Sequence, residues 1–229
     1  SFDKLRVLAS VFNVSVQAFS DVVDLEEYED LKPATGDARS VIETGNAALR
    51  AGEMARAFAH FERALELLEC EPAETDRDEQ LAQARINLAA ALTRLGKLAL
   101  AEQELRNALR SADGLTGTIQ ARALLNLAIV HSDQGDLLLA EMEADRAYGI
   151  ATRASLDLLA ARACHVLAGV LAQRRRESEA IEKYREAADL YARSGEAYEA
   201  IRVRVSVGLC YVTVGKIREG IRLVRSALE

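Results

Sequence analysis

Two residue patterns in this sequence could recognise a ligand. Arginine recurs at intervals of 40 residues, at Arg122, Arg162 and Arg202. Asparagine stands in two Asn-Leu-Ala triplets, at Asn87 and Asn126. An amide side chain offers both a donor and an acceptor to an extended peptide backbone, and a guanidinium binds a carboxylate through two parallel hydrogen bonds. The patterns therefore favour a binding surface for a peptide or protein that carries a carboxylate.

The sequence contains no recognisable motif for covalent catalysis or for metal binding. The histidines His60, His131 and His165 form no HxxxH or HExxH motif, and the three cysteines form no CxxC pair. Cys164 and His165 are neighbours, but consecutive residues on a helix point about 100° apart and cannot act as nucleophile and base. The sequence has neither a glycine-rich phosphate loop nor a GxSxG motif. We expect no enzyme activity, metal or cofactor, and a structural role for His131.

The elements that must position the ligand-binding residues follow from an internal repeat. Small residues recur at intervals of 44, 39, 40 and 40 residues. The three columns are Gly45, Ala89, Ala128, Ala168 and Gly208; Ala57, Ala101, Ala140, Ala180 and Gly220; and Ala64, Ala108, Ala147, Ala187 and Ala227. Small side chains let two helix backbones approach closely, and apolar spacings of three and four predict two helices per repeat. A glycine such as Gly96 suits the left-handed position that ends a helix, and Arg175 occupies that position in the fourth repeat.

Equivalent positions on the first helix of each repeat form columns across the stack. One column holds Arg39, Gln83, Arg122, Arg162 and Arg202, and the other, four residues on, holds Glu43, Asn87, Asn126, Val166 and Ser206. Positions i and i+4 are neighbours on a helix, so both columns should lie on one face. Two alternatives remain open: the asparagines bond locally, and the arginines pair with acids of the adjacent repeat.

The repeat resembles the tetratricopeptide repeat over about residues 38–229. The family's signature small residues fall at Gly45, Ala57 and Ala64, and its aromatic falls at Phe61. The period near 40 residues, against about 34 in the family, is similar to the variant repeats of kinesin light chains and bacterial signal-sensing regulators. The resemblance implies an all-α, right-handed superhelical solenoid of about five helix pairs, whose first helices line a concave groove. It also implies that the asparagines of the Asn-Leu-Ala triplets bind the main chain of a peptide there.

Residues 1–23 do not fit the repeat. Leu8-Ala9, Asn13-Val14-Ser15 and Phe19 resemble the last two helices of a Cro/repressor-like (XRE-type) helix-turn-helix domain, in which Ser15 would cap the second helix and Phe19 would pack on Leu8 and Phe12. The resemblance implies that the recognition helix lies upstream of Ser1, so DNA would be bound only through a head outside this chain. The alternative is an ordinary helical cap on the solenoid.

Composition and charge bound the function further. Half of the 229 residues are hydrophobic, 5% are aromatic and two are proline, which is typical of a helical protein. The net charge of −7 is concentrated in residues 1–38 and 70–80, which argues against binding DNA phosphates by bulk attraction. Residues 24–37 are predicted to be a solvated acidic linker.

The sequence also predicts where the protein resides. The longest mainly apolar stretch, residues 158–172, is too short to span a membrane, and there is no signal peptide. Cys70, Cys164 and Cys210 are expected to be reduced core thiols of a cytoplasmic protein.

Two features near the end of the chain complete the predictions. Arg174-Arg175-Arg176 is predicted to be a solvated helix end, or a contact for an acidic partner. In the last repeat Ile221, Val224 and Leu228 are expected to face outward, towards a continuing chain or the second subunit of a homodimer. Together the two resemblances imply the peptide-sensing domain of a bacterial helix-turn-helix regulator. In that mechanism the ligand would shift the populations of two solenoid curvatures. The alternative is a constitutive scaffold or adaptor with no DNA role.

Overall fold

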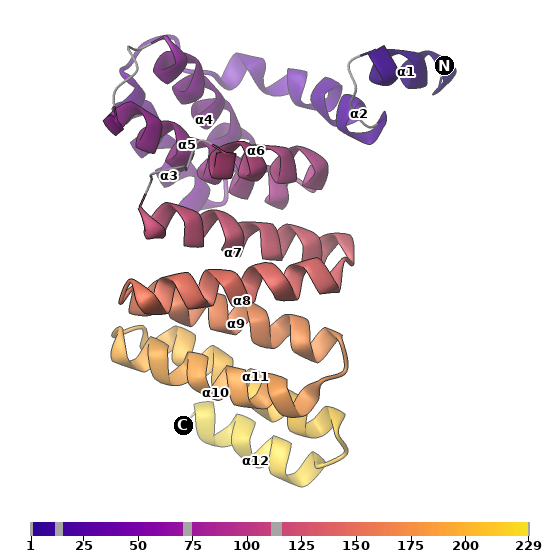
Figure 1. The fold of residues 1–229 in the computed structure, drawn as a ribbon, viewed down its shortest axis with the longest axis vertical. Helices are drawn as coiled ribbons and strands as arrows, with labels where there is room; N and C mark the ends of the chain where they lie inside the picture. The colour runs from indigo at the N-terminus through magenta and orange to yellow at the C-terminus, as the bar shows by residue number, and fades with distance from the viewer. Residues whose placement is uncertain (1, 12–15, 71–74, 111–115, 229) are drawn as a thin grey trace. The chain divides into compact units, whose positions relative to one another are not determined.

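The protein is built from α-helices, one 3₁₀ helix and short turns throughout the part of the chain that the structure describes. That part covers residues 2–11, 16–70, 75–110 and 116–228 of a computed structural model (Figure 1). The chain divides into two compact units, residues 1–115 and 116–229. The N-terminal unit contains α1 (Phe2–Val11), α2 (Val16–Leu25), the 3₁₀ helix η1 (Glu26–Leu31), α3 (Ala38–Ala51), α4 (Met54–Glu69), α5 (Thr75–Arg94) and α6 (Leu98–Arg110). The C-terminal unit contains α7 (Gly117–Gln134), α8 (Leu137–Arg153), α9 (Asp157–Gln173), α10 (Glu177–Arg193), α11 (Ala197–Thr213) and α12 (Ile217–Leu228).

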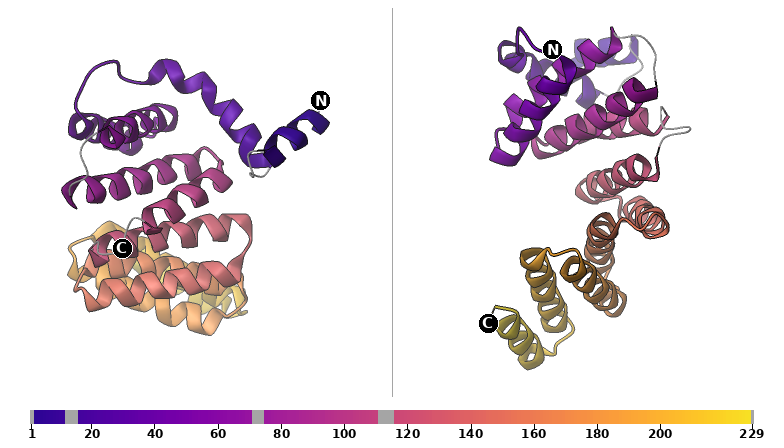
Figure 2. Two further views of the ribbon diagram at one scale, coloured as in Figure 1. Left: turned by 45° about the horizontal axis from the view of Figure 1, so that its top comes forward. Right: turned by 90° about the vertical axis from the view of Figure 1, so that its left-hand side faces the viewer.

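The helices pair as the repeat predicts. In the N-terminal unit α3 packs on α4, α4 on α5 and α5 on α6. In the C-terminal unit each helix from α7 to α12 packs on the next, and the helices lie side by side in Figure 2. The expected five helix pairs and all-α solenoid class are therefore confirmed. Within the described residues, no helix is both long and apolar enough to cross a membrane.

The small-residue columns lie where paired helices touch. Their fully buried members, each 0% exposed, are Ala57, Ala64, Ala89, Ala101, Ala108, Ala128, Ala140, Ala147, Ala168, Ala180 and Ala187. The approach is closest at the last pair, where a Cβ on Gly208 would lie 2.9 Å from the carbonyl oxygen of Gly220 and 2.6 Å from Cγ2 of Val224. Contacts this short leave no room for a methyl group, which explains why this pair holds two glycines where the second to fourth repeats hold alanine.

The turns within the repeats use the left-handed backbone that the sequence predicts. Gly96 and Gly135 follow α5 and α7 at φ 76° and 85°. Arg175 takes the same place after α9 at φ 61°. An L-residue in this conformation is strained by roughly 1–2 kcal/mol, so the fourth repeat tolerates a cost that the others avoid with glycine.

The arginine triplet around Arg175 is not simply a solvated helix end. Arg174 and Arg176 both form ion pairs with Glu141 of α8, and Arg176 also pairs with Glu179. The turn between α9 and α10 is therefore tied to the preceding helix pair.

The structure describes only part of the predicted helix-turn-helix remnant. Residues 12–15, including the predicted cap Ser15, lie outside the described residues, as do the side chains of Leu8 and Phe19. The helix-turn-helix resemblance thus stays a prediction. What the structure describes is a pair of ten-residue helices, α1 and α2, that contact each other.

The predicted acidic linker is largely helical and packed. α2 continues to Leu25, and η1 lies against α4, where the Tyr28 ring meets the Phe58 ring edge-on at 6.1 Å between centroids. Lys32 forms ion pairs with Glu62 and Glu66 of α4 at 3.0 and 2.9 Å. The sequence of this segment did not reveal these contacts, because the partners of Tyr28 and Lys32 lie 30 or more residues away.

Lys97, which precedes α6, holds α2 in the same manner. Its ammonium lies 2.6 Å from Asp24 and 3.3 Å from Asp21, which is 3% exposed. The hydrogen bond to Asp24 raises the pKa of Lys97 despite the opposing effect of burial. The N-terminal helices are thus joined to the first two repeats by ion pairs.

The end of the last repeat differs in part from expectation. Ile221 is 53% exposed and faces outward as predicted, but Val224 is half-buried and packs against Gly208 of α11. The side chain of Leu228 lies outside the described residues. The outward apolar stripe on α12 is formed by Ile217, 55% exposed, and Ile221.

Candidate functional site

The C-terminal unit brings the predicted arginines onto its first helices. Arg122, Arg162 and Arg202 stand at equivalent positions of α7, α9 and α11, and α7 contacts α9 directly. Arg122 is half-buried, whereas Arg162 is exposed. Burial lowers the pKa of Arg122, and the positive charge of Arg162 lowers it further. The two guanidinium charges, from consecutive repeats, therefore lie close enough to influence each other.

Arg202 already has an acidic neighbour. Its guanidinium lies 2.7 Å from Glu199, one turn earlier on α11, and its side chain is 53% exposed. Exposed pairs of this spacing contribute little, on the order of 0.2–1 kcal/mol, so the pairing does not prevent Arg202 from binding a second carboxylate. The alternative in which the arginines pair with acids of an adjacent repeat does not describe this ion pair, which lies within one helix.

His165 lies one turn after Arg162 on α9, although the sequence patterns did not select it. His165 is half-buried three residues after Arg162, and its ring meets the Tyr191 ring edge-on at 6.2 Å. Burial lowers the pKa of His165, and the charge of Arg202 lowers it further, which keeps the imidazole neutral near pH 7. The i, i+3 spacing from Arg162 is the sequence signal that could have identified His165.

Asn126 lies one turn after Arg122 on α7, and its amide donates one hydrogen bond. Its Nδ2 donates to the backbone carbonyl of Arg122 at 2.8 Å, one turn earlier on α7. Its Oδ1 accepts no hydrogen bond within the described residues. The half-buried amide can therefore still accept a hydrogen bond from a ligand N–H.

Asn87 lies in the other unit and has a different environment. It is 6% exposed, it accepts a hydrogen bond from Gln83 at 2.8 Å, and it donates one to Asn46 of α3 at 2.9 Å. The bond from Gln83, one turn earlier on α5, is local, whereas the bond to Asn46 joins α5 to α3. The first column continues in the N-terminal unit through Gln83 and the exposed Arg39.

The thiols and histidines fit structural roles better than chemistry. Burial raises the pKa of the Cys164 thiol to about 12, and its Sγ contacts the Lys183 carbonyl at 3.2 Å. Cys210 is also buried, but Cys70 is exposed, so the expectation of three core thiols is wrong for Cys70. His131 is 2% exposed and its Nδ1 lies 2.6 Å from Glu143 of α8, which confirms its structural assignment.

Within the described residues no group of three or more His, Cys, Asp or Glu side chains is arranged to hold a metal ion. The guanidinium groups, the amide and the imidazole described above can form hydrogen bonds to charged groups and to a peptide backbone.

Comparison with known proteins identifies the fold. The sequence matches no family model and no curated protein sequence. Among solved structures, it resembles a Rap protein complexed with competence and sporulation factor, with a TM-score of 0.75 and 16% identity over 96% of this chain and 60% of that one. It resembles the TPR-like repeats of a putative kinesin light chain from Podosopora anserina, with a TM-score of 0.65 and 15% identity over 82% and 92% of the chains.

A third solved structure is YrrB, described as a TPR protein with an unusual peptide-binding site. The TM-score is 0.50, with 19% identity over 84% of this chain and 85% of that one. Similarity at these identities shows the fold alone. The protein is a tetratricopeptide-like repeat solenoid, and repeat proteins of this architecture present extended surfaces to other molecules.

Proposed function

We propose that this protein senses a peptide or protein ligand, and that the face formed by Arg122, Arg162 and Arg202 binds a carboxylate of that ligand. The observation that carries the proposal is that Arg122, Arg162 and Arg202 stand at equivalent positions of α7, α9 and α11, with Arg162 and Arg202 exposed, and a guanidinium can bind a carboxylate through two parallel hydrogen bonds. The fold agrees with this role: a similar Rap protein is found in complex with competence and sporulation factor, and YrrB has a peptide-binding site.

In this proposal, neighbouring groups recognise the rest of the ligand. The Oδ1 atom of Asn126 accepts a hydrogen bond from a ligand backbone N–H, and neutral His165 supplies a further polar contact. Asn87, because its amide is already paired, contributes to the repeat structure and is proposed as a ligand contact only if its bond to Asn46 opens. Ligand binding would favour one arrangement of the stacked helices over another, which is a population shift.

The test is a screen of short peptides with free carboxyl termini by fluorescence polarisation, followed by the same screen with amidated termini. Arg162→Gln is expected to weaken binding of the selected peptide at least tenfold. Arg218→Gln is the matched control, since Arg218 is an exposed arginine of α12 outside the column. Equal affinity of the wild type and Arg162→Gln for the selected peptide, with unchanged helical circular dichroism, would refute the site assignment.

The finer proposals concern what the sensor controls. A transcriptional role depends on a DNA-binding head outside residues 1–229, and it requires that the ligand change the DNA affinity of a chain carrying that head. The exposed stripe of Ile217 and Ile221 supports a homodimer, which sedimentation velocity of an Ile221→Glu variant would test. A constitutive adaptor would bind its partner through the same arginine face with no effect on DNA.

A further inference from the structure

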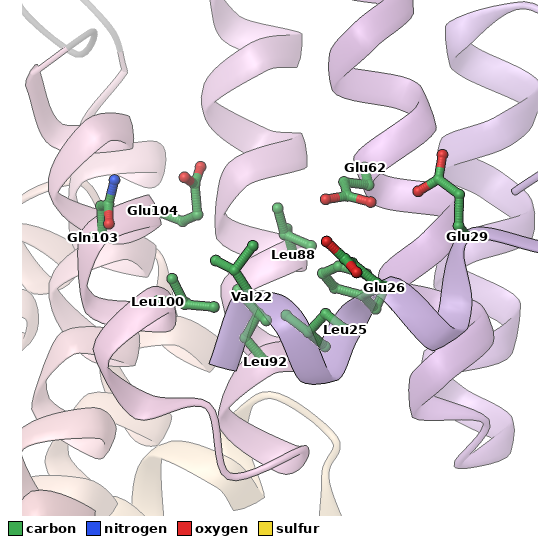
Figure 3. Close-up of a pocket in the computed structure, with 11 residues that line it drawn as sticks. Val22, Leu25, Glu26, Glu29, Glu62, Leu88, Leu92, Leu100, Gln103 and Glu104 are labelled. Carbon is green, nitrogen blue, oxygen red and sulfur yellow. The ribbon is translucent and has the colours of Figure 1, made fainter. Parts of the chain in front are cut away.

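The N-terminal unit contains a pocket of about 300 Å³ that the proposed ligand site does not use (Figure 3). It is enclosed by α2 and η1 on one side and by α4, α5 and α6 on the other. Its lining consists of Val22, Leu25, Glu26, Glu29, Phe58, Glu62, Leu88, Leu92, Leu100, Gln103 and Glu104. We call it the acidic-rimmed pocket.

The floor of the acidic-rimmed pocket is apolar and well packed. Leu88 and Leu92 of α5 are 5% and 2% exposed, and Leu25 of α2 is 7% exposed. Val22, in contrast, is 50% exposed on α2. The pocket therefore presents apolar surface to solvent on a packed support and need not form anew when a ligand arrives.

The rim carries four carboxylates, on Glu26, Glu29, Glu62 and Glu104. In Figure 3 the carboxylates of Glu26 and Glu62 lie beside Leu88, and that of Glu104 lies on its other side. None of the eleven described lining residues is a lysine or an arginine. The pocket thus combines an apolar interior with a rim of one sign of charge.

The nearest cations do not neutralise this rim. Lys32 is shared among Glu29, Glu62 and Glu66, at 2.8 to 3.0 Å. Arg85 is shared between Glu104, at 2.7 Å, and Glu69, at 3.0 Å. Glu26 has no ion-pair partner in the part of the chain that the structure describes. An excess of negative charge therefore remains at the pocket.

We infer that the acidic-rimmed pocket binds a basic, apolar segment of a partner protein, in which an arginine or lysine stands next to a leucine or phenylalanine. The long stem of a basic side chain packs on apolar surface while its charged head binds carboxylates, which matches the floor and the rim. A pocket of about 300 Å³ is at the small end of ligand sites and fits two such side chains better than a larger cofactor. The pocket recognises positive charge, whereas the arginine face of the C-terminal unit recognises negative charge.

The experiment titrates the intact protein with three capped peptides: acetyl-Leu-Arg-Leu-Arg-amide, acetyl-Leu-Glu-Leu-Glu-amide and acetyl-Ser-Arg-Ser-Arg-amide. The amide cap removes the terminal carboxylate, so failure of the proposed ligand site does not affect the result. The readout is the NMR shift of the Leu88, Leu92 and Leu100 methyl groups. We expect saturable shifts with the first peptide and at least fivefold weaker binding of the other two. Equal binding of the Ser-Arg peptide would show that net charge alone attracts the peptides, and it would overturn the inference. The absence of methyl shifts with the Leu-Arg peptide would also overturn it.

A charge-reversed pair of variants locates the binding. Glu26→Lys places a cation at the rim, and it is expected to weaken binding of the Leu-Arg peptide at least fivefold. Asp30→Lys makes the same change in charge on the same 3₁₀ helix, at an exposed residue outside the lining, and is expected to weaken binding less than twofold. Both side chains are exposed, so both variants should keep the wild-type circular dichroism. Equal losses in the two variants would show that net charge alone attracts the peptide, and the pocket would not be the site.

Discussion

Replacing Asn87 with alanine tests whether its amide stabilises the fold or binds the ligand. Asn87→Ala removes the hydrogen bonds at 2.8 Å from Gln83 and at 2.9 Å to Asn46, and it leaves their groups without these partners. A typical hydrogen bond contributes about 1 kcal/mol net, so the two together contribute about 2 kcal/mol. Alanine is a better helix former than asparagine, so the replacement also adds about 0.5 kcal/mol to the unfolding free energy. The expected loss of unfolding free energy is therefore about 1.5 kcal/mol.

The assay is urea denaturation followed by circular dichroism, with Asn126→Ala as the matched control. Asn126 makes one hydrogen bond, to a backbone carbonyl of its own helix, and it is half-buried. Its replacement should change the unfolding free energy by less than about 0.5 kcal/mol, because the lost bond and the gain in helix propensity nearly cancel. A double-mutant cycle of Asn87→Ala with Asn46→Ala should give a coupling energy of about 1 kcal/mol.

The opposite pattern would refute this reasoning. If Asn87→Ala unfolds at the wild-type urea concentration but loses affinity for a selected peptide, the amide is a ligand contact and its bond to Asn46 is dispensable. The same peptide assay on Asn126→Ala then decides whether both triplets contact the ligand.

Three further predictions concern packing, backbone and thiol reactivity. Gly208→Ala should lower the unfolding free energy by about 1–3 kcal/mol in thermal or urea denaturation, because its methyl group would overlap the backbone of Gly220; wild-type stability would show that α12 moves away freely. Arg175→Gly should raise stability by about 0.5–1 kcal/mol in the same assay, since it relieves an L-residue held at φ 61°, and a loss would mean that the arginine side chain contributes more than the strain. Iodoacetamide at pH 8 should modify exposed Cys70 at least a hundredfold faster than buried Cys164, whose pKa is raised to about 12; mass spectrometry of digested protein would detect equal rates if the core opened readily.

The helix pairs were predictable from sequence because their determinants are local and periodic. Ala101 and Ala108 are seven residues apart, which places them on one face of a helix, and both are buried. Small residues recur at the equivalent positions of the other repeats. The glycine that follows four of the five first helices likewise specifies a left-handed turn without reference to the rest of the chain. The same logic assigned Arg175 to a glycine position, which the structure confirms.

The partners of the polar side chains were not predictable in this way. Lys97 pairs with Asp21 across 76 residues, and Asn87 bonds Asn46 across 41 residues. A charge run such as residues 24–31 is compatible with a solvated linker as well as with a packed 3₁₀ helix, and only the positions of α4 and α6 decide between them.

The sequence by itself therefore determined the repeat, the helix pairs and the columns in which Arg122, Arg162 and Arg202 stand. The tertiary structure alone decided that Asn87 is buried and paired while Asn126 keeps a free acceptor, and that an apolar pocket with an acidic rim lies beside α2. The physical reason is that helix formation and small-residue packing depend on neighbours a few residues apart. Hydrogen bonds, ion pairs and pockets depend on side chains that meet only after the helices have packed.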